Sequence, residues 1–466
     1  MQPVVTVAGM RASDAAALAS VDEAELVRRA GHAVAVRALA LLGGAYGHRV
    51  VVLAGKGNNG ADGKVAAGIL ARRGAKVAVV DAAAAPRELP ACDLVVDAAY
   101  GTGFRGTYEA PEVPAGAAVL AVDVPSGVDG DTGTASGRPL RATATVTFAA
   151  WKTGLLLGDG PDYCGTVSVA DIGVPVVAAT AELIEDADVR ALLPPRPRLT
   201  HKWASAVAVV AGSPGMEGAA HLAAHGAARA GAGMVRLAVP GADPDDGLVA
   251  GAWPLEAVRV SLTRPDWATT VLEVLGRCRA LVVGPGLGRE EATVAEVRRL
   301  VAASPVPVVV DADGLFALGK VDEARAVVAG DTGVDRPVVL TPHDGEYARL
   351  AGHPPGGDRL AAARELAEGS GAVALLKGSL TAVAAPGDGS VLLSSAGSPR
   401  LATAGTGDVL SGVIGAFLAR GVPAQWAAAL AAHVHGRAAG LGPGDGLVAP
   451  DLPELVAAWL AGTVAP

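Results

Sequence analysis

Short valine-rich runs alternate with longer alanine-rich stretches along this chain, and the alternation occurs in two separate series. Short β-branched runs separated by helical patterns of about ten to fifteen residues predict βαβ units and a mainly parallel sheet. The first series has predicted strands at residues 50–53, 77–80, 94–96, 119–122 and 144–148. The second has them at residues 206–210, 235–239, 280–283, 306–310, 338–340, 372–375 and 381–384. The chain is therefore predicted to be an α/β protein with two domains.

The two series are separated by the run Leu193-Pro194-Pro195-Arg196-Pro197-Arg198. Its prolines can continue neither a helix nor a central strand, so we interpret the run as a linker. A length of 466 residues is enough for two to three domains. We place the boundary near residue 197, which gives domains of residues 1–196 and 197–466. Ahead of the first strand, residues 14–42 predict an amphipathic helix or a pair of helices ending at Gly43-Gly44.

The composition narrows the class of protein. Hydrophobic residues make up 51% of the chain, and the formal net charge is −9 with a pI near 5.5. With no basic surplus to neutralise phosphates, the chain is predicted to bind neither nucleic acid nor an anionic membrane. The three cysteines are far apart, and no signal peptide or membrane span is recognisable, which favours a cytoplasmic location. The alanine-rich helices favour self-association as a homo-oligomer.

A glycine-rich loop follows the first predicted strand and contains Gly55, Gly57 and Gly60 with GxGxxG spacing. Where such a loop opens a helix, free backbone N–H groups and the helix dipole can hold a phosphate. The spacing alone is a weak signal, and a tight turn without a ligand is the alternative. Polar residues that a simple turn does not need follow at Asn58-Asn59 and Asp62. Further polar loops begin at Asp97 and Asp123, at the carboxyl ends of later strands, where parallel sheets collect their ligands.

The motifs NNGADG, DAAYGTGFRG and DVPSGVDG, with the later Trp151-Lys152-Thr153-Gly154, resemble the NAD(P)H-hydrate epimerase family over residues 8–190. The resemblance implies a Rossmann-like three-layer sandwich that binds a hydrated nicotinamide nucleotide and a potassium ion. It implies potassium ligands at Asn59, Asp97 and Ser126. Hard oxygen ligands of this kind suit an alkali cation. The implied substrate-binding residues are Asn58, Asn59, Gly60, Ala61, Asp62, Gly101, Thr102, Gly103, Phe104, Arg105, Gly106, Thr107 and Asp123.

Two further expectations concern the same domain. Asp123 is the leading candidate for the acid/base group at C6 of the nicotinamide ring, and Lys152 is the second candidate. Ala61 stands where the family usually has glycine. Alanine would cost about 1 kcal/mol if this backbone were left-handed, but nothing if the position starts a helix, and we favour the helix.

The second glycine loop, Gly405-Thr406-Gly407-Asp408, combines a predicted anion hole with a carboxylate at a helix start. That pairing suits phosphoryl transfer, because backbone N–H groups stabilise the transferred group while the aspartate takes a proton from the accepting hydroxyl. A helix cap is the structural alternative. Other polar or glycine-rich loops follow strands at Gly284-Pro285-Gly286-Leu287-Gly288, Asp311-Ala312-Asp313-Gly314, Thr341-Pro342-His343-Asp344-Gly345-Glu346 and Lys377-Gly378-Ser379-Leu380-Thr381.

Together these loops resemble the ribokinase-like superfamily and, more narrowly, ADP-dependent NAD(P)H-hydrate dehydratase, over residues 199–460. The resemblance implies a ribokinase-like α/β domain with ADP as co-substrate. Contacts to the hydrated substrate are implied for Ala219, Gly286, His343 and Asp408. Contacts to the nucleotide are implied for Lys377, Gly378, Ser379, Leu380, Thr381 and Gly407. A Mg²⁺ ion is expected to bridge the phosphates, and Asp408 to act as the catalytic base.

The sequence therefore predicts an enzyme that epimerises the R and S hydrates of NADH and NADPH and dehydrates the S hydrate with ADP. One alternative is an ATP-dependent vitamin kinase fused to a nucleotide-binding domain, and another is a first domain that only senses nucleotides. Four histidines give weaker indications of a metal site. The pair His221 and His225 lacks the glutamate of HExxH, so packing is favoured over a metal site. His433 and His435 are interpreted as packing or surface residues.

Overall fold

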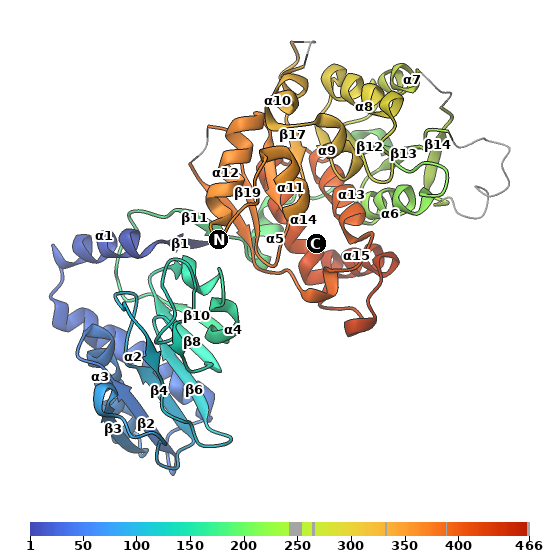
Figure 1. The fold of residues 1–466 in the computed structure, drawn as a ribbon. Helices are drawn as coiled ribbons and strands as arrows, with labels where there is room; N and C mark the ends of the chain where they lie inside the picture. The colour runs from blue at the N-terminus through green and yellow to red at the C-terminus, as the bar shows by residue number, and fades with distance from the viewer. Residues whose placement is uncertain (242–253, 263–265, 331–332, 388, 464–466) are drawn as a thin grey trace. The chain divides into compact units, whose positions relative to one another are not determined.

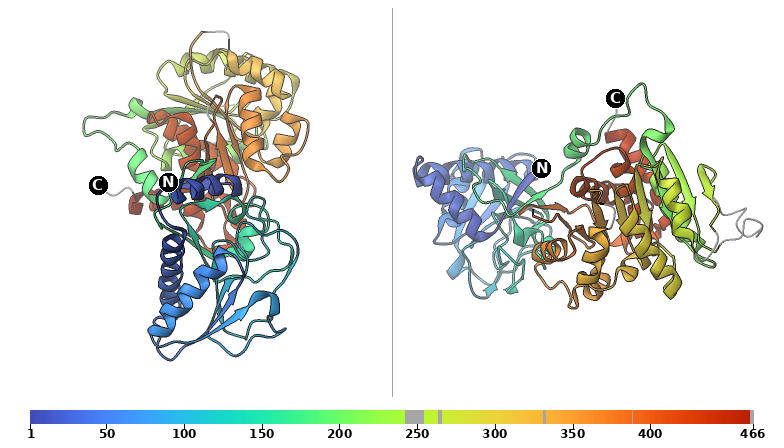
Figure 2. Two further views of the ribbon diagram at one scale, coloured as in Figure 1. Left: turned by 90° about the vertical axis from the view of Figure 1, so that its left-hand side faces the viewer. Right: turned by 90° about the horizontal axis from the view of Figure 1, so that it is seen from above.

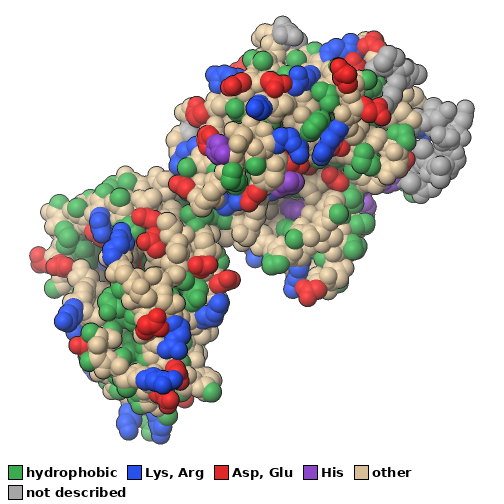
Figure 3. All heavy atoms as spheres, in the orientation of Figure 1, with side chains coloured by type: hydrophobic (Ala, Val, Ile, Leu, Met, Phe, Trp, Pro, Cys, Tyr) green, Lys and Arg blue, Asp and Glu red, His purple; other side chains and the backbone are tan. Residues whose placement is uncertain are grey.

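The computed structural model describes residues 1–466 except 242–253, 263–265, 331–332, 388 and 464–466. The chain divides into two compact units, residues 2–181 and residues 182–466, the second also including Met1. Among the described residues, no helix combines the length and the apolarity that a membrane crossing requires. Acidic and basic side chains are interspersed over the surfaces shown in Figure 3.

The N-terminal unit is built on a six-stranded sheet in which each neighbouring pair of strands is parallel. In spatial order its strands are β10 (Thr166–Ala170), β8 (Ala144–Phe148), β6 (Ala118–Val122), β4 (Leu94–Ala98), β2 (Arg49–Ala54) and β3 (Lys76–Asp81). All five strands predicted for this half are confirmed. The predictions missed β10, and also β1 (Gln2–Val5), which pairs with the short β9 (Trp151–Lys152).

Helices α2 (Glu23–Leu42) and α3 (Asn58–Arg72) pack together over one face of this sheet (Figure 1). Gly31 permits their close approach, because a Cβ there would lie 2.5 Å from Val65 Cβ. Helix α2 ends at Gly43, whose φ of 68° is left-handed, as glycine allows. The preceding helix, α1 (Val7–Leu18), is capped by the Thr6 side chain. The predicted helix pair is thus confirmed, with α1 starting earlier than expected.

The other face of the sheet is covered mainly by irregular segments. Leu89, Tyr108 and Leu140 pack there against alternate residues of β2, β4 and β6. Regular structure in this layer is limited to short pieces: β5 (Tyr108–Glu109), its partner β7 (Gly137–Arg138), and α4 (Gly160–Cys164). The predicted α/β sandwich therefore has an outer layer made largely of loops.

The sheet of the C-terminal unit runs β14-β13-β12-β15-β16-β17-β18-β19-β20. Pairing is parallel from β14 to β18 and antiparallel between β18, β19 and β20. The strands are β12 (Ala206–Val210), β13 (Met234–Ala238), β14 (Ala257–Val260), β15 (Ala280–Val283), β16 (Val308–Val310), β17 (Val338–Leu340), β18 (Val373–Leu376), β19 (Thr381–Ala384) and β20 (Val391–Ser394). The seven strands predicted for this half are confirmed, whereas β14 and β20 were missed.

Two layers of helices enclose this sheet (Figures 1 and 2). The layer that carries the second glycine loop comprises α6 (Glu217–Arg229), α13 (Thr406–Ala419), α14 (Ala424–Ala439) and α15 (Leu452–Thr463). The other comprises α7 (Trp267–Leu275), α8 (Glu291–Ala303), α9 (Asp313–Leu318), α10 (Val321–Ala329), α11 (Asp344–Ala351) and α12 (Arg359–Ser370). Gly226 and Gly412 let α6 and α13 touch, because a Cβ on Gly412 would lie 2.1 Å from Ala223 O.

The division into units falls earlier than the predicted boundary near residue 197. Helix α5 (Asp186–Leu192) belongs to the C-terminal unit, where Ile184, Val189 and Leu193 are part of the main apolar core. Polar contacts fix it as well, since Asp186 accepts hydrogen bonds from Arg437 and pairs with His433 Nε2 at 2.8 Å. The proline run therefore follows an element that already packs on the second unit.

Candidate active sites

A cavity of about 870 Å³ lies at the carboxyl ends of β2, β4 and β6 in the N-terminal unit. Ten residues predicted for the first site line it: Asn58, Asn59, Asp62, Gly101, Thr102, Gly103, Phe104, Arg105, Asp123 and Lys152. Six others do not line it in the structure as described: Gly60, Ala61, Asp97, Gly106, Thr107 and Ser126. The strand ends thus gather loops that lie far apart in the sequence, as the parallel sheet predicts.

The shape of the first glycine loop depends on two close backbone contacts. A Cβ on Gly55 would lie 1.9 Å from Ala99 O, and one on Gly60 would lie 2.0 Å from Gly55 O. Ala61 lies inside α3, and its N–H donates to Gly57 O at 3.1 Å. The position is helical, so alanine fits there without strain, as expected from the helix interpretation.

Asp123 and Lys152 form a buried pair at the floor of this cavity. Lys152 Nζ lies 2.6 Å from Asp123 Oδ1 and donates to Thr147 Oγ1 and to Phe148 O, both at 2.9 Å. A lysine ammonium has three N–H donors, so these contacts commit all of them. Lys152 is 1% exposed, and Thr147 Oγ1 also donates to Asp123 Oδ1, at 3.1 Å. Lys152 therefore orients Asp123.

The backbone at Asp123 is unusual. Its φ is 68°, one of three positive values at non-glycine residues in the described chain. Such a conformation costs on the order of 1 kcal/mol, and is retained where the surroundings enforce it. Here the N–H of Asp123 donates to Val146 O at 2.8 Å, just beyond the end of β6. The strain directs the carboxylate toward Lys152 and the cavity.

Two more carboxyl groups border the same cavity. Burial, reinforced by the negative charge of Asp123, raises the pKa of Asp62 to about 8. Asp14, on α1, was not predicted. Burial and Asp123 raise its pKa, while Lys152 acts in the opposite direction. The cavity thus contains a paired carboxylate, Asp123, and a carboxyl, Asp62, that stays largely protonated at neutral pH.

Of the three predicted potassium ligands, Asn59 lines the cavity, whereas Asp97 and Ser126 lie outside its lining and bond each other. Asp97 is fully buried and accepts from Ser126 Oγ at 2.6 Å and from Ser126 N at 3.0 Å, while burial raises its pKa. Asn59 Nδ2 donates to Tyr100 O and to Val122 O, both at 3.0 Å. Ser126 Oγ also contacts Tyr100, accepting from its N–H at 2.9 Å. Asn59 and Ser126 thus share Tyr100 as a backbone partner, and Ser126 in turn holds Asp97.

A second cavity, of about 680 Å³, lies in the C-terminal unit between the second glycine loop and the strand ends. It is lined by six predicted residues: His343, Lys377, Gly378, Ser379, Thr381 and Gly407. Its lining also includes Leu401, Leu410, Ala432 and His435, none of which was predicted. Ala219, Gly286, Leu380 and Asp408 do not line this cavity in the described structure.

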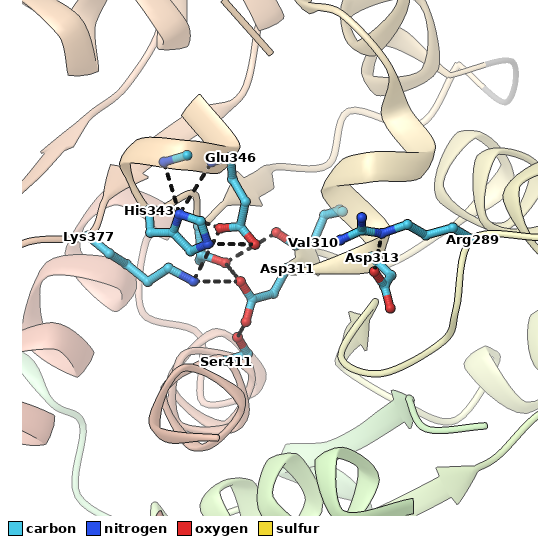
Figure 4. Close-up of polar contacts among 10 residues, drawn as sticks. Arg289, Val310, Asp311, Asp313, His343, Glu346, Lys377 and Ser411 are labelled. Atoms are coloured by element: carbon cyan, nitrogen blue, oxygen red, sulfur yellow. Dashed lines mark hydrogen bonds and ion pairs between the residues drawn. The ribbon is translucent and has the colours of Figure 1, made fainter. Parts of the chain in front are cut away.

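Asp311 anchors the polar side of this site (Figure 4). Its Oδ1 accepts from Lys377 Nζ at 2.8 Å and from Thr341 Oγ1 at 2.7 Å, and its Oδ2 accepts from Ser411 Oγ at 2.7 Å. Burial alone would raise the pKa of Asp311, but Lys377 and these hydroxyl groups hold it below its usual value. The loop containing Asp311 was predicted as polar, but no role was assigned to it.

The start of α13 lies beside Lys377. Gly405 caps this helix with a φ of 90°. A Cβ on Gly407 would lie 3.5 Å from Lys377 Nζ, an ordinary contact distance, so the ammonium is adjacent to the first turn of the helix. Helix N-termini attract anions, and the adjacent ammonium adds a full positive charge. The N-terminus of α13 and the Lys377 ammonium thus lie side by side, and the anion hole stays a prediction.

Asp408 lies in the first turn of α13, outside the lining of this cavity. Burial and the negative charge of Asp311 raise its pKa to about 7, although Lys377 acts in the opposite direction. Glu346 and Asp313 add to the upward shift. A carboxylate with a pKa near neutrality can take up a proton efficiently at the pH where the protein works.

His343 and Glu346 form a reciprocal cap at the start of α11. His343 Nδ1 accepts from Gly345 N at 3.0 Å, and Glu346 Oε2 accepts from His343 N at 2.9 Å. Glu346 Oε2 also lies 3.7 Å from Lys377 Nζ. The cap holds the His343 ring at the mouth of the cavity, where the ring is exposed (Figure 4).

Two of the predicted substrate contacts, Ala219 and Gly286, lie together outside the lining of the second cavity. A Cβ on Gly286 would be 2.8 Å from Ala219 Cβ, and Gly286 has a φ of 63°. Ser213 Oγ donates to Gly286 O at 2.9 Å. Asp313, at the start of α9 after β16, accepts from Gly288 N at 3.0 Å and so joins that segment to the loop containing Gly286. This second group of loops therefore lies outside the apolar cavity, and Asp313 connects it electrostatically to Asp408.

Comparison with known families gives two matches along the chain. The family model described as NAD(P)H-hydrate dehydratase matches residues 207–456. The model described as YjeF-related protein N-terminus matches residues 23–90 and 80–154.

Whole-chain relatives cover both units. A bifunctional NAD(P)H-hydrate repair enzyme of Mycobacterium leprae is 39% identical, and the alignment covers 96% of each chain. One of Moorella thermoacetica is 38% identical over 84% of this chain and 82% of its own. Among solved structures, the ADP/ATP-dependent NAD(P)H-hydrate dehydratase of Bacillus subtilis, co-crystallised with ATP/Mg²⁺, is 28% identical. It matches with a TM-score of 0.51 over 61% of this chain and 100% of its own. A ribokinase-like superfamily protein of Enterococcus faecalis, 19% identical over 63% of this chain and 99% of its own, shows the same fold with a TM-score of 0.53.

Proposed function

This chain belongs to the family of bifunctional NAD(P)H-hydrate repair enzymes, and on that premise we propose how its two sites divide the work. The N-terminal unit interconverts the R and S hydrates of NADH and NADPH. The C-terminal unit dehydrates the S hydrate and converts ADP to AMP and phosphate. The observation that carries the proposal is the pair of separate cavities, one built around Asp123 and the other around Lys377 and the start of α13.

In the epimerase site, Asp123 and Asp62 would act as base and acid. As the C6–N1 bond of the hydrate opens, ionised Asp123 accepts the proton of the C6 hydroxyl and protonated Asp62 donates one to N1. Rotation about the C5–C6 bond presents the other face of the resulting aldehyde, and the two transfers reverse as the ring closes. The contrast between paired Asp123 and Asp62, whose pKa is about 8, supports this division of roles.

The potassium proposal rests on the chemistry of the group around Asn59. The Asn59 amide places two N–H donors against the carbonyls of Tyr100 and Val122, where a small cation would make equivalent contacts. With the amide rotated, its oxygen would join those carbonyls and the buried Asp97–Ser126 pair as ligands. Neutral oxygens with one carboxylate suit a monovalent cation. Potassium and sodium titrations of Asp97→Ala test this, because an unchanged potassium response would remove Asp97 from the ligand set.

In the dehydratase site, Asp408 would take the proton of the C6 hydroxyl. The oxygen of that hydroxyl would then attack the β-phosphorus of ADP, and AMP would leave. The C6–O bond then breaks with the phosphate as leaving group, driven by the N1 lone pair, and loss of a C5 proton restores the dihydropyridine. Lys377 and the first N–H groups of α13 would hold the transferred phosphoryl. Ala219, Gly286 and His343 would contact the hydrated ring.

A magnesium ion would supply charge neutralisation on the nucleotide phosphates. In the described part of the chain, no three histidine, cysteine or acidic side chains converge on a possible metal position. The Glu346 carboxylate, whose Oε2 lies 3.7 Å from Lys377 Nζ, is a hard oxygen ligand of the kind Mg²⁺ accepts. We therefore propose Glu346 as the residue that would help to hold the ion beside the nucleotide.

The two activities are proposed to reside in units that fold separately. A cut between Ala181 and Glu182 keeps α5 with the core it packs against, whereas a cut near residue 197 removes Ile184, Val189 and Leu193 from that core. Residues 182–466 should dehydrate the S hydrate with ADP, and residues 1–181 should epimerise without nucleotide. If the C-terminal piece melts cooperatively but works only when the N-terminal piece is added, the proposed independence is wrong.

One assay separates this function from the vitamin-kinase alternative. Mixed R and S hydrates are supplied, and recovery of reduced-nicotinamide absorbance is followed with and without ADP. We expect complete recovery with ADP and AMP plus phosphate as products. A phosphorylated small molecule in place of free phosphate would indicate a kinase. Binding of the hydrates without interconversion would indicate a sensor domain.

A further inference from the structure

His435 was interpreted from the sequence as a packing or surface residue, but the structure places it in the wall of the second cavity. It lies on α14, one turn after Ala432, and both residues line the cavity. Only 5% of His435 is exposed. The neighbouring Gly436 explains its position, because a Cβ there would lie 2.4 Å from Ala396 O. The helix therefore presses against the loop before Gly397, another residue of the lining.

One ring nitrogen of His435 is left without a partner. Its Nε2 is buried and forms no hydrogen bond with any described residue. The ring does bond the backbone of Thr406, a contact that favours the protonated ring and therefore has the imidazole as donor. Burial nevertheless lowers the pKa of His435 to about 4, and Lys377 lowers it further. The neutral ring, with one nitrogen donating to Thr406, carries a lone pair on Nε2.

A buried acceptor without a hydrogen bond lowers the stability of the protein. A ligand that donates a hydrogen bond to it removes this penalty and therefore binds more tightly. Ionised phosphate oxygens are acceptors, so they cannot form a hydrogen bond with the lone pair on Nε2. The nearby lining is apolar at Leu401, Leu410 and Ala432, as a flat base or sugar requires. An adenine nucleotide has two kinds of neutral donor, the 6-amino group of the base and the hydroxyl groups of the ribose.

We propose that His435 Nε2 accepts a hydrogen bond from the nucleoside part of the adenine nucleotide and so selects which nucleotide the second site uses. This inference rests on the proposed function of the cavity as the nucleotide site. It makes His435 a specificity residue that touches the base or the ribose while Lys377 and α13 hold the phosphates.

The test is ADP binding to the full chain in the presence of Mg²⁺, measured by calorimetry. His435→Gln keeps a hydrogen-bond acceptor within reach of the Nε2 position, and His435→Met removes it at similar volume. We expect ADP affinity close to that of the wild type for the glutamine variant and about tenfold weaker for the methionine variant. His433→Gln is the matched control, since that buried histidine on the same helix bonds Asp186 instead.

Two analogues identify the donor. Inosine diphosphate carries an oxo group in place of the amine, and 2′-deoxy-ADP lacks one ribose hydroxyl. We expect one of them to bind the wild type about tenfold more weakly than ADP, and the methionine variant to lose that preference. Equal ADP affinity of wild type and methionine variant would overturn the inference, as would a loss in the variant that is the same for all three nucleotides. If the methionine variant does not fold, the wild type and the glutamine variant provide the test. The inference holds if both bind the same analogue about tenfold more weakly than ADP, and it fails if either does not. Failure of the folded wild type to bind any of the nucleotides would instead refute the proposed function.

Discussion

Each cavity is built around a lysine–aspartate pair, but the two pairs are anchored from opposite ends. In the N-terminal unit the lysine is fixed: Lys152 commits its three donors to Asp123, Thr147 and Phe148. In the C-terminal unit the aspartate is fixed, since both oxygens of Asp311 are engaged by Lys377, Thr341 and Ser411. The first arrangement presents a carboxylate to the substrate, and the second presents a cation. The same ion pair can therefore support proton transfer or anion binding, depending on which partner the fold immobilises.

The largest effect that separates the two sites is expected from Asp408→Asn. Loss of a general base costs about 10²- to 10⁴-fold in rate, so ADP-dependent dehydration should fall by that factor. Epimerisation should be unchanged, because Asp123 lies in the other unit. Absorbance recovery measures the first activity, and chromatographic separation of the R and S hydrates measures the second. A parallel loss of both in a folded variant would mean that the two chemistries share one site.

Removing the lysine from each pair should break the sites in different ways. Lys152→Met leaves half-buried Asp123 without its cationic partner, which should lower the free energy of unfolding by about 1–3 kcal/mol and abolish epimerisation. Thermal melting and the epimerase assay measure these effects, with Lys76→Met, an exposed lysine of the same unit, as control.

Lys377→Met should weaken ADP binding, and it should also lower the free energy of unfolding by about 3–5 kcal/mol, because it leaves the buried carboxylate of Asp311 with hydroxyl partners only. The positive charge beside Gly407 is lost, so we expect ADP affinity to fall by about tenfold or more. Epimerisation should not change. Calorimetric titration with ADP measures the loss. If ADP binds this variant as tightly as wild type, the idea that the second pair presents its cation to the nucleotide is wrong.

The two activities should respond to pH in opposite directions. Asp408 must be ionised to act as a base, and burial raises its pKa to about 7, so dehydration should decline about tenfold per pH unit below 7. Asp62 must be protonated to act as an acid, and burial raises its pKa to about 8, so epimerisation should decline above pH 8. Rate profiles of kcat between pH 5 and 10, with cooperative folding checked at each end, measure both limbs. Profiles with the same direction would contradict the assignment of an acid to one site and a base to the other.

The smallest effect concerns the backbone of the first loop. Ala61→Gly should lower the free energy of unfolding by about 1 kcal/mol, because glycine is unfavourable inside a helix such as α3. Epimerisation should be retained, since Ala61 does not line the cavity among the described residues. Denaturant unfolding of the N-terminal unit measures the change. A gain in stability would show that the alanine is strained after all.

Much of the fold follows from the sequence, because valine-rich strands and glycine turns act locally. The strands predicted in both halves are present, and the loops at their carboxyl ends converge as a parallel sheet requires. The family and the fold class predicted from the motifs are confirmed. The boundary was placed too late by the proline run, because the packing of α5 on α14 depends on contacts that local sequence does not display.

The candidate sites were predictable where a residue stands in a loop motif and not where it stands in a helix. Asp14 and His435 lie in alanine-rich helices, and only the tertiary packing brings them to the cavities. The commitment of every Lys152 donor was likewise invisible in the sequence, and it changes Lys152 from a candidate acid/base to a residue that positions Asp123. A role for Asp311 in the site was predictable, because it stands in one of the polar loops that follow the predicted strands.

Helix α13 carries the anion site at its first turn, and from Val409 to Ala419 every residue is buried. A helix enclosed in this way has no route to local opening, so its amide hydrogens should exchange with solvent only when the whole unit unfolds. Heat inactivation of the dehydratase should then coincide with loss of the fold, with no intermediate that keeps its structure but has lost its phosphate site. The dehydratase should therefore remain active for as long as the core of this unit remains folded.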